Sequence, residues 1–271
     1  MPRESGKSLR RARRRLDLAL VERGLTESRS TAQRLILAGE VRVDGETVRR
    51  ASQLVSGEAR LELTAPPRFV SRGGVKLAAA LSTFELAVAG KTCADVGAST
   101  GGFTDCLLQH DARSVFAIDV GQGILHWKLR QDPRVVVLEG TNARYLTELP
   151  SAVELVTIDV SFISLRLILP VAVHWLTPGG DVVALVKPQF EAGREAVGKG
   201  GVVRDPAVHR KVIDDVINHS ASAGLAPQGL IRSPLRGPKG NIEFLLWARK
   251  GGEARSLDGE IERAIGAAIG D

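Results

Sequence analysis

Two predicted strands end in oppositely charged residues, and this pattern is the first sign of chemistry in the sequence. The strand 153–159 ends in Asp159, and the strand 181–187 ends in Lys187. A charge on a strand buried on both faces is costly unless it is paired or functional. Adjacent parallel strands would bring the two side chains together at the edge where such sheets bind ligands. A structural ion pair is the other reading; we favour function because a cofactor site is expected at the same edge.

Two further charged residues are candidates for the same site. Lys76 lies near the start of the helix that precedes the first strand of the large domain. Glu243 lies at the start of a late apolar strand, 242–248. Each of them alone is a common kind of surface charge, so their candidacy depends on where the fold places them.

A glycine-rich turn follows the first strand of the large domain. The strand 92–96 contains Asp95, and the turn reads Gly97-Ala98-Ser99-Thr100-Gly101-Gly102 before a predicted helix at 102–109. A turn of this composition between a strand and a helix indicates a nucleotide-like ligand.

Three ligand classes compete for this turn. A phosphate loop has lysine after its last glycine, but Phe103 stands there, which disfavours ATP and GTP. A dinucleotide turn has glycine where Ser99 stands, so a pyrophosphate would meet a side chain. The turn of an S-adenosylmethionine site has an acid near the end of the strand, and Asp95 fits it. Asp119, on the next strand, can accept hydrogen bonds from ribose hydroxyls.

Alternating short strands and helices predict an α/β fold, with a Rossmann-like parallel sheet that has helices on both faces. The strands are expected at 92–96, 114–120, 135–138, 153–159, 181–187 and 242–248, and the helices at 102–109, 165–175 and 207–223. The loop 188–205 is long and contains Arg194, Lys199 and Arg204, which predicts a lid that faces RNA.

A small α+β unit is predicted before the large domain. Residues 16–24 and 28–39 have the apolar spacing of two short helices that end at glycine. Asp44-Gly45 between β-branched residues predicts a hairpin. The expected organisation is a basic disordered arm at 1–15, the small unit at 16–63, a linker at 64–67 with two prolines, the large domain at 68–250 and a C-terminal tail at 251–271.

The positive charge is concentrated at the start of the chain. Residues 1–15 contain seven arginines or lysines and one acid. Their net charge, +6, equals that of the whole chain. A basic segment of this density attracts polyanions, and we favour contact with nucleic acid over a solubilising tail.

Composition excludes several other classes of protein. With 44% hydrophobic and 25% charged residues, the chain is globular, and it contains no apolar run long enough to span a membrane as a helix. Two cysteines, Cys93 and Cys106, are too few for a disulfide framework, so we expect a reducing cytoplasm and two buried thiols. The five histidines have no metal-ligand spacing, and no metal is expected. Trp127 and Trp175 are expected in the core.

The small unit resembles a known RNA-binding module. The run RLDLALVERGLTESRSTAQRLILAGEVRVDG is similar to a module of a small-subunit ribosomal protein and of pseudouridine synthases. This resemblance implies two helices and a hairpin with a basic face that binds structured RNA.

The large domain resembles the TlyA family of ribosomal RNA 2′-O-methyltransferases, often labelled hemolysins. The matching stretches are SRGGVKL, DVGASTGGFTDCLLQ, HWKLRQDPRVVVLE, DVSFISL, LVKPQFE, GKGGVVRDP and GNIEFLL. The family implies an FtsJ-type methyltransferase fold, S-adenosyl-L-methionine as cofactor, and transfer to cytidine riboses of ribosomal RNA or ribosomal subunits. One departure is Gln122, where the resemblance leads us to expect an aromatic residue.

The resemblance also implies roles for individual residues. Its catalytic set of two lysines, an aspartate and a glutamate falls on Lys76, Asp159, Lys187 and Glu243. The candidate cofactor-binding residues are Asp95, Gly97, Ser99, Thr100, Gly101, Gly102, Asp119 and Asn142. The candidate RNA-binding residues are Arg10, Arg11, Arg13, Arg14, Arg15, Arg29, Arg34, Arg42, Arg72, Arg194 and Lys199.

Two other functions remain as alternatives. A non-catalytic RNA-binding factor for ribosome assembly would have the methyltransferase fold but lack residues of the site. Asp95, Asp119 and Lys187 are all present, which disfavours this alternative. A membrane-active hemolysin is less favoured, because the sequence shows neither a spanning segment nor a clear amphipathic insertion helix, and no stable membrane association is expected.

Overall fold

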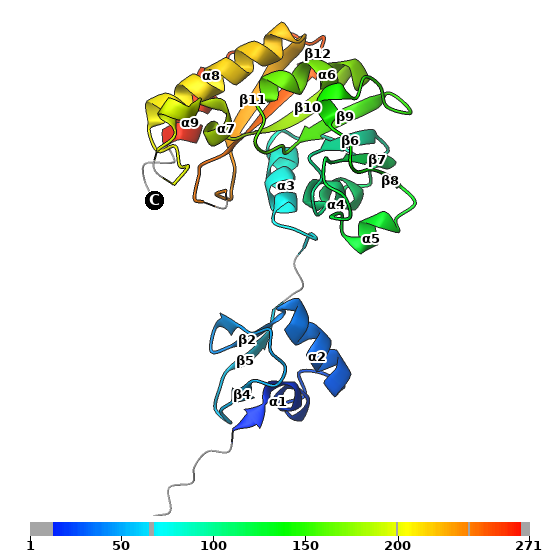
Figure 1. Cartoon of the computed structure of the whole chain (residues 1–271), viewed down its shortest axis with the longest axis vertical. Coiled ribbons are helices and arrows are strands. Elements are labelled where there is room, and N and C mark those ends of the chain that lie inside the picture. Colours follow the sequence, from blue (N-terminus) through cyan, green and yellow to red (C-terminus); the bar gives the residue numbers. More distant parts are fainter. Residues whose placement is uncertain (1–12, 65–67, 199, 238, 267–271) are drawn as a thin grey trace, which may run out of the picture. The chain divides into compact units, whose positions relative to one another are not determined.

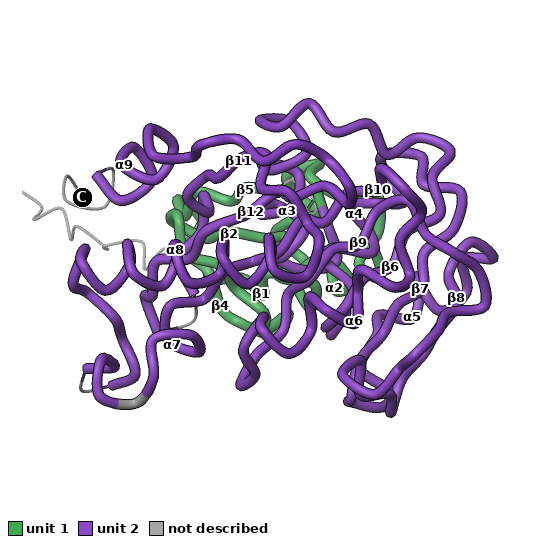
Figure 2. The backbone as a smooth tube through the Cα atoms, turned by 90° about the horizontal axis from the view of Figure 1, so that it is seen from above, with its two compact units in different colours: residues 1–68 green, residues 69–271 purple. Residues whose placement is uncertain are grey.

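The computed structural model describes residues 13–64, 68–198, 200–237 and 239–266. The chain divides into two compact units, residues 1–68 and 69–271, coloured separately in Figure 2. The division falls directly after the proline-containing segment.

The small unit is built from two helices and short strands. Its elements are β1 (Arg14–Arg15), α1 (Leu16–Glu22), α2 (Arg29–Ala38), β2 (Val41–Val43), β3 (Glu46–Thr47), β4 (Leu54–Val55) and β5 (Leu61–Leu63). Ser28 caps α2 by accepting a hydrogen bond from the backbone N–H of Thr31. Asp44 and Gly45 both have positive φ, as the tight turn between β2 and β3 requires. Leu16, Leu20 and Ile36 are fully buried in the core.

The prediction of a disordered arm up to residue 15 is wrong at its end. Arg14 and Arg15 form β1, which pairs antiparallel with β4. Arg14 also pairs with Glu22, and Arg15 pairs with Asp17. These contacts hold the two arginines in the folded unit. Arg10 and Arg11 lie outside the described residues.

The large unit is a seven-stranded sheet in the order β11-β12-β10-β9-β6-β7-β8 (Figure 1). The strands are β6 (Thr92–Val96), β7 (Ser114–Ile118), β8 (Val135–Leu138), β9 (Val153–Ile158), β10 (Leu176–Val186), β11 (Leu225–Arg232) and β12 (Phe244–Lys250). The five strands β6 to β10 are parallel to one another, whereas β12 lies antiparallel between β10 and β11. The expectation of a parallel sheet is therefore wrong at this edge, because β11 and β12 follow each other as a hairpin.

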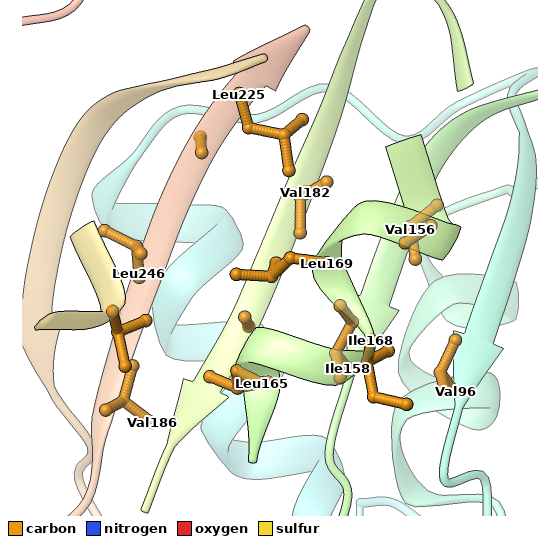
Figure 3. Close-up of a cluster of buried hydrophobic side chains, with 14 of the residues drawn as sticks. Val96, Val156, Ile158, Leu165, Ile168, Leu169, Val182, Val186, Leu225 and Leu246 are labelled. Atoms are coloured by element: carbon orange, nitrogen blue, oxygen red, sulfur yellow. The ribbon is translucent and has the colours of Figure 1, made fainter. Parts of the chain in front are cut away.

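Helices cover both faces of this sheet. They are α3 (Gly73–Thr83), α4 (Gly102–Gln109), α5 (Trp127–Arg130), α6 (Leu169–Trp175), α7 (Pro188–Glu191), α8 (Pro206–Ser222) and α9 (Asp258–Gly266), with the short 3₁₀ helices η1 (Ala143–Tyr145), η2 (Leu165–Leu167) and η3 (Arg194–Ala196). Alternate residues of β10 divide between the two faces: Val182 and Val186 pack with α6, α8 and α9, while Val183 and Leu185 pack with α3 and α4. Figure 3 shows part of the first cluster.

Several predicted elements differ in detail. The helix expected at 165–175 is divided into η2 and α6 at Ile168, with Pro170 in the first turn of α6. The expected tail at 251–271 contains α9, which buries Ile261 and Ala264. The loop 188–205 contains α7 and η3. Of these segments, η2, α6 and α9 contribute buried residues to the hydrophobic core.

The burial of the cysteines and tryptophans tests four predictions. Cys93 and Cys106 are buried free thiols, and Trp175 is in the core, as expected. The prediction for Trp127 is wrong, since its side chain is 59% exposed.

Candidate active site

The fold brings the four charged candidates to one edge of the sheet. Asp159 directly follows β9 and Lys187 directly follows β10, its parallel neighbour. Glu243 precedes β12, whose first residue pairs with the last residue of β10. Lys76 projects from the first turns of α3. The carboxyl ends of the central strands and the start of the antiparallel strand therefore meet at the same place.

The four side chains form two close ion pairs. Lys187 Nζ lies 2.5 Å from Asp159 Oδ1, and Lys76 Nζ lies 2.5 Å from Glu243 Oε2. The meeting of Asp159 and Lys187 expected from the strand pattern is confirmed. Both lysines are less than one tenth exposed, and Glu243 is 1% exposed. Charges this deeply buried are tolerated because each has an opposite partner.

The two ion pairs line one cavity of about 270 Å³, which we call the charged cavity. Ser99, Thr100 and Gly102 of the glycine-rich turn also line it, as does Arg72. The lysines and carboxylates thus face a small ligand in the cavity, and their partial burial strengthens their electrostatic effect on a reacting group.

A second cavity, of about 390 Å³, lies on the other side of the turn, and we call it the turn cavity. It is lined by Gly97, Ser99, Asp119 and Asn142, together with apolar residues such as Ile124. Gly97, Ser99, Asp159 and Ser161 line both cavities, so the two are neighbours. A ligand in the turn cavity can therefore reach the charged cavity.

Asp119 lines the turn cavity and is held there by backbone hydrogen bonds. Its Oδ2 accepts a hydrogen bond from the backbone N–H of Ser99 at 2.8 Å, and its Oδ1 accepts one from Gly121 at 2.7 Å. Each carboxylate oxygen has a further lone pair, so the group can still accept bonds from two hydroxyls.

The structure does not bring Asp95 into either cavity. Its side chain is fully buried, where it accepts hydrogen bonds from the hydroxyls of Thr104 at 2.7 Å and Thr157 at 3.2 Å. Burial raises the pKa of this carboxyl to about 7. The predicted cofactor contact of Asp95 is therefore not supported; its hydrogen bonds give it a structural role, in which it ties β6 to α4 and β9.

The glycines of the turn serve close packing. A Cβ on Gly97, which has φ +82°, would lie 2.5 Å from the carbonyl oxygen of Asp159. A Cβ on Gly102 would lie 2.2 Å from Ser71 Oγ. A Cβ on Gly101 would meet Leu129 of α5 rather than open space. Gly101 lines neither cavity, so its predicted cofactor contact is not supported.

Sequence reasoning missed Glu139, which organises the rim of the turn cavity. Its carboxylate accepts hydrogen bonds from the backbone N–H groups of Gly123, Ile124 and Leu125, and pairs with Arg130. The Arg130 side chain and these N–H groups lower the pKa of Glu139 to about 2. The sequence around Glu139 does not indicate this role, because its hydrogen-bond partners are backbone N–H groups 14 to 16 residues away.

A third cavity, of about 360 Å³, adjoins Lys187 and Glu243. Ser161, Phe162 and Phe190 also line it, and the two phenylalanine rings lie 5.0 Å apart. Phe162 is 91% exposed. A planar, partly apolar group could therefore enter this third cavity and reach Lys187 and Glu243. Sequence reasoning also missed Ser161, which lines all three cavities.

The candidate RNA-binding arginines are placed in different ways. Arg13, Arg34 and Arg42 are exposed. Arg15 and Arg29 both bind the buried carboxylate of Asp17. The side chain of Arg194 and the whole of Lys199 lie outside the described part of the chain.

Within the described residues, no helix is both long and apolar enough to cross a membrane. The same residues contain no cluster of histidine, cysteine or acidic side chains suited to a metal ion.

Comparisons with known proteins agree with this architecture. The model of the FtsJ-like methyltransferase family matches residues 69–250, and that of the S4 domain matches residues 14–61. The 16S/23S rRNA (cytidine-2′-O)-methyltransferase TlyA of Mycobacterium tuberculosis is 46% identical over 261 residues, 93% of this chain and 97% of that protein. Hemolysin A of Brachyspira hyodysenteriae is 43% identical over 85% of this chain and 98% of its own length.

A solved structure agrees as well. A hemolysin-named protein from Streptococcus thermophilus superposes with a TM-score of 0.74 at 42% identity, and the match covers 96% of both chains. The chain therefore belongs to the FtsJ-like methyltransferase family, with an S4 domain ahead of the methyltransferase domain.

Proposed function

We propose that this protein transfers a methyl group from S-adenosylmethionine to the 2′-oxygen of a cytidine ribose in ribosomal RNA. The observation that carries the proposal is the pair of buried ion pairs in one cavity beside the glycine-rich turn. The name of the Mycobacterium tuberculosis relative supports the substrate. Such a substrate implies action in the cytoplasm. The alternative of a membrane-active hemolysin is supported only by the names of relatives.

The residues of the turn cavity fit the cofactor. Asp119 has lone pairs for ribose hydroxyls, Ile124 offers an apolar surface to an adenine ring, and Gly97 and Ser99 expose backbone beside them. Asn142 lines the same cavity. When bound, S-adenosylmethionine supplies a methyl group on a sulfonium, a leaving group that needs no acid.

The chemical task left to the protein is to position and activate a ribose hydroxyl. Lys187 takes or shares the proton of the 2′-hydroxyl at Nζ, or stabilises the developing negative charge on the oxygen. Asp159 holds Lys187 in place through the 2.5 Å contact. Lys76 and Glu243 form the second ion pair of the set, beside Lys187 and Asp159.

The S4 domain and the exposed arginines supply RNA contact in this proposal. Arg13, Arg34 and Arg42 of the small unit offer charges to phosphates, and Arg72 lies at the wall of the charged cavity. The segment 188–205, which follows Lys187, acts as a lid over RNA. Its deletion is expected to weaken RNA binding and to leave cofactor affinity unchanged, whereas an unchanged RNA affinity would contradict the lid.

The test is a map of ribose methylation on ribosomal RNA from cells with and without this protein. A cytidine that loses its 2′-O-methyl group in the deletion strain and regains it with the wild-type gene, but not with Lys187→Ala, supports the proposal. Calorimetric titration with S-adenosylmethionine separates an enzyme from a non-catalytic assembly factor. Leakage of liposomes by the purified protein, together with an unchanged methylation map, would favour a membrane-active function instead.

A further inference from the structure

The hydroxyl of Ser161 lies beside the amine of Lys187. Lys187 Nζ donates a hydrogen bond to Ser161 Oγ at 3.0 Å, in addition to its contact with Asp159. Ser161 lines the charged, turn and third cavities. It is therefore located where cofactor, substrate and lysine would meet.

The two contacts restrict the rotation of the amine. A lysine nitrogen has four tetrahedral positions, one of which is occupied by Cε. In the form in which Lys187 acts as the base, the other three positions hold two N–H groups and one lone pair. If Asp159 and Ser161 accept the two N–H groups, the lone pair takes the one position left for a substrate. With Asp159 alone, the second N–H and the lone pair can exchange places.

We propose that Ser161 is a positioning residue that directs the lone pair of Lys187 toward the 2′-hydroxyl. The inference rests on the proposed function and deepens it. The proton that leaves the 2′-oxygen goes to the lone pair of Nζ, and the 2′-oxygen forms the new bond to the methyl carbon. The resulting ammonium has three N–H groups, which are donated to Asp159, Ser161 and the product oxygen.

Threonine and valine at position 161 provide a matched pair, because they have nearly the same shape and only threonine keeps the hydroxyl. Ser161 is exposed, which leaves room for the added methyl groups. We expect Ser161→Val and Ser161→Ala to lower kcat by about ten- to a hundredfold, as the loss of a hydrogen bond to a charged group implies. Ser161→Thr keeps most of kcat. The KM for RNA and the Kd for S-adenosylhomocysteine stay within about twofold of wild type in this interpretation.

Three results would overturn the inference: wild-type kcat in Ser161→Val and Ser161→Ala, an equal loss in all three variants, or a loss confined to S-adenosylhomocysteine affinity. A second readout does not depend on methyl transfer. In protein labelled with ¹³C at lysine Cε, the Lys187 signal, assigned through Lys187→Arg, is expected to change in Ser161→Val and to persist in Ser161→Thr. If wild type shows no transfer to ribosomal RNA, the proposed function fails while this signal still tests the contact.

A separate observation concerns the surface next to the glycine-rich turn. Trp127, the first residue of α5, is 59% exposed, with its ring stacked on His126 and with Lys128 Nζ 5.9 Å from the ring centroid. The segment is anchored, because His126 N donates to the carbonyl oxygen of Thr100 at 3.2 Å and Leu129 is buried against the turn. Thr100 lines the charged cavity, so the residue directly before Trp127 is bonded to the wall of the candidate active site.

We infer that Trp127 stacks on an unpaired base of the substrate RNA, with Lys128 near an adjoining phosphate. Aromatic side chains bind bases of single-stranded RNA through their faces, and neighbouring cations match the charge of the backbone. The positive charge of Lys128 beside the ring favours RNA over an apolar protein surface. This inference also rests on the proposed function, since it assumes that RNA reaches the charged cavity.

Tryptophan fluorescence tests this contact in the full chain. The probe is a ribosomal RNA fragment that contains the mapped methylation site. RNA is expected to quench the emission of wild-type protein, and Trp127→Leu is expected to lose this quenching and about tenfold in affinity. Trp127→Phe keeps most of the affinity, because a phenyl ring still stacks.

An RNA affinity of Trp127→Leu equal to that of the wild type would overturn the inference. Self-association of the wild-type protein that Trp127→Leu abolishes would also overturn it, because a second copy would then cover the ring. RNA binding without methyl transfer would separate this contact from a failure of the proposed function.

Discussion

Gly97→Ala is expected to damage catalysis through the backbone of Asp159. A Cβ at position 97 would lie 2.5 Å from the Asp159 carbonyl oxygen, whereas ordinary contact begins at 3.4 Å, so that oxygen must withdraw by about 0.9 Å. The N–H of Asp159 is bonded to the carbonyl oxygen of Val96, and its side chain holds Lys187. A misplacement of about 1 Å in a catalytic group can reduce the rate about a hundredfold.

The same substitution also affects stability. Alanine at φ +82° costs about 1–2 kcal/mol, and overpacking against the Asp159 carbonyl adds about 1–3 kcal/mol. Gly90→Ala is the matched control, because Gly90 has φ +74° and nothing within 4 Å of the added Cβ. It should show the backbone cost alone and keep wild-type kcat.

The assays are urea unfolding and methyl transfer at saturating cofactor and RNA. We expect Gly97→Ala to be less stable than Gly90→Ala and to have a kcat lower by about two orders of magnitude. If the two variants have equal stability and equal kcat, then the close approach of Gly97 to Asp159 does not position the site, and the reasoning is refuted.

Further predictions concern five other positions. Burial raises the pKa of Asp95 to about 7, so this group opposes folding increasingly as pH rises from about 4 toward 7; Asp95→Asn should therefore gain stability relative to wild type at pH 8, measured by urea unfolding, and a constant difference from pH 5 to 8 would contradict this. Hydrogen bonds from Arg15, Gln33 and Arg29 hold the pKa of Asp17 below its usual range, so their stabilisation is present near neutral pH and is lost as pH falls below about 4; Asp17→Ala should cost about 1.5–3 kcal/mol at pH 7, measured by hydrogen exchange in the small unit, and the difference should shrink in acid. Glu139→Gln should weaken S-adenosylhomocysteine binding about three- to tenfold in calorimetry, because one amide oxygen cannot hold three backbone N–H groups and Arg130. Lys76→Met and Glu243→Leu should each cost about 3–5 kcal/mol in urea unfolding, because each leaves an unpaired buried charge, and the double variant should cost less than either; recovery of kcat in the double variant would make this pair structural.

Strand patterns located the charged site because Asp159 and Lys187 stand where two predicted strands end. The four residues before Lys187 are apolar, as are three of the four before Asp159, so the two strand ends can be read from the sequence. Their contact then follows from parallel neighbours in an open sheet. The turn at Asp44 and Gly45 was equally readable, because few residue pairs accept two positive φ values.

Local patterns could not show how segments distant in sequence pair or which way a side chain points. β11 contains Pro227 and Gly229, which hide its strand character, and its antiparallel pairing with β12 depends on tertiary contacts. Asp95 follows the pattern of a ligand-binding acid, yet Thr104 and Thr157 turn it inward. Trp127 matches a core residue by type, but α5 is too short to cover both of its faces and buries Leu129 instead.

The burial of the ion pairs bears on whether they are structural or functional. A buried pair stabilises a fold poorly, since hydrophobic residues of similar volume are often as good or better. Here two pairs stand side by side in a cavity, at the edge where a parallel sheet binds ligands. The Arg210 cluster shows the alternative: it joins α8 to α9 through exposed acids and lines none of the three cavities beside the glycine-rich turn. The desolvation of Lys76, Lys187 and Glu243 is therefore better explained by a reaction that needs dry, preorganised charge than by stability.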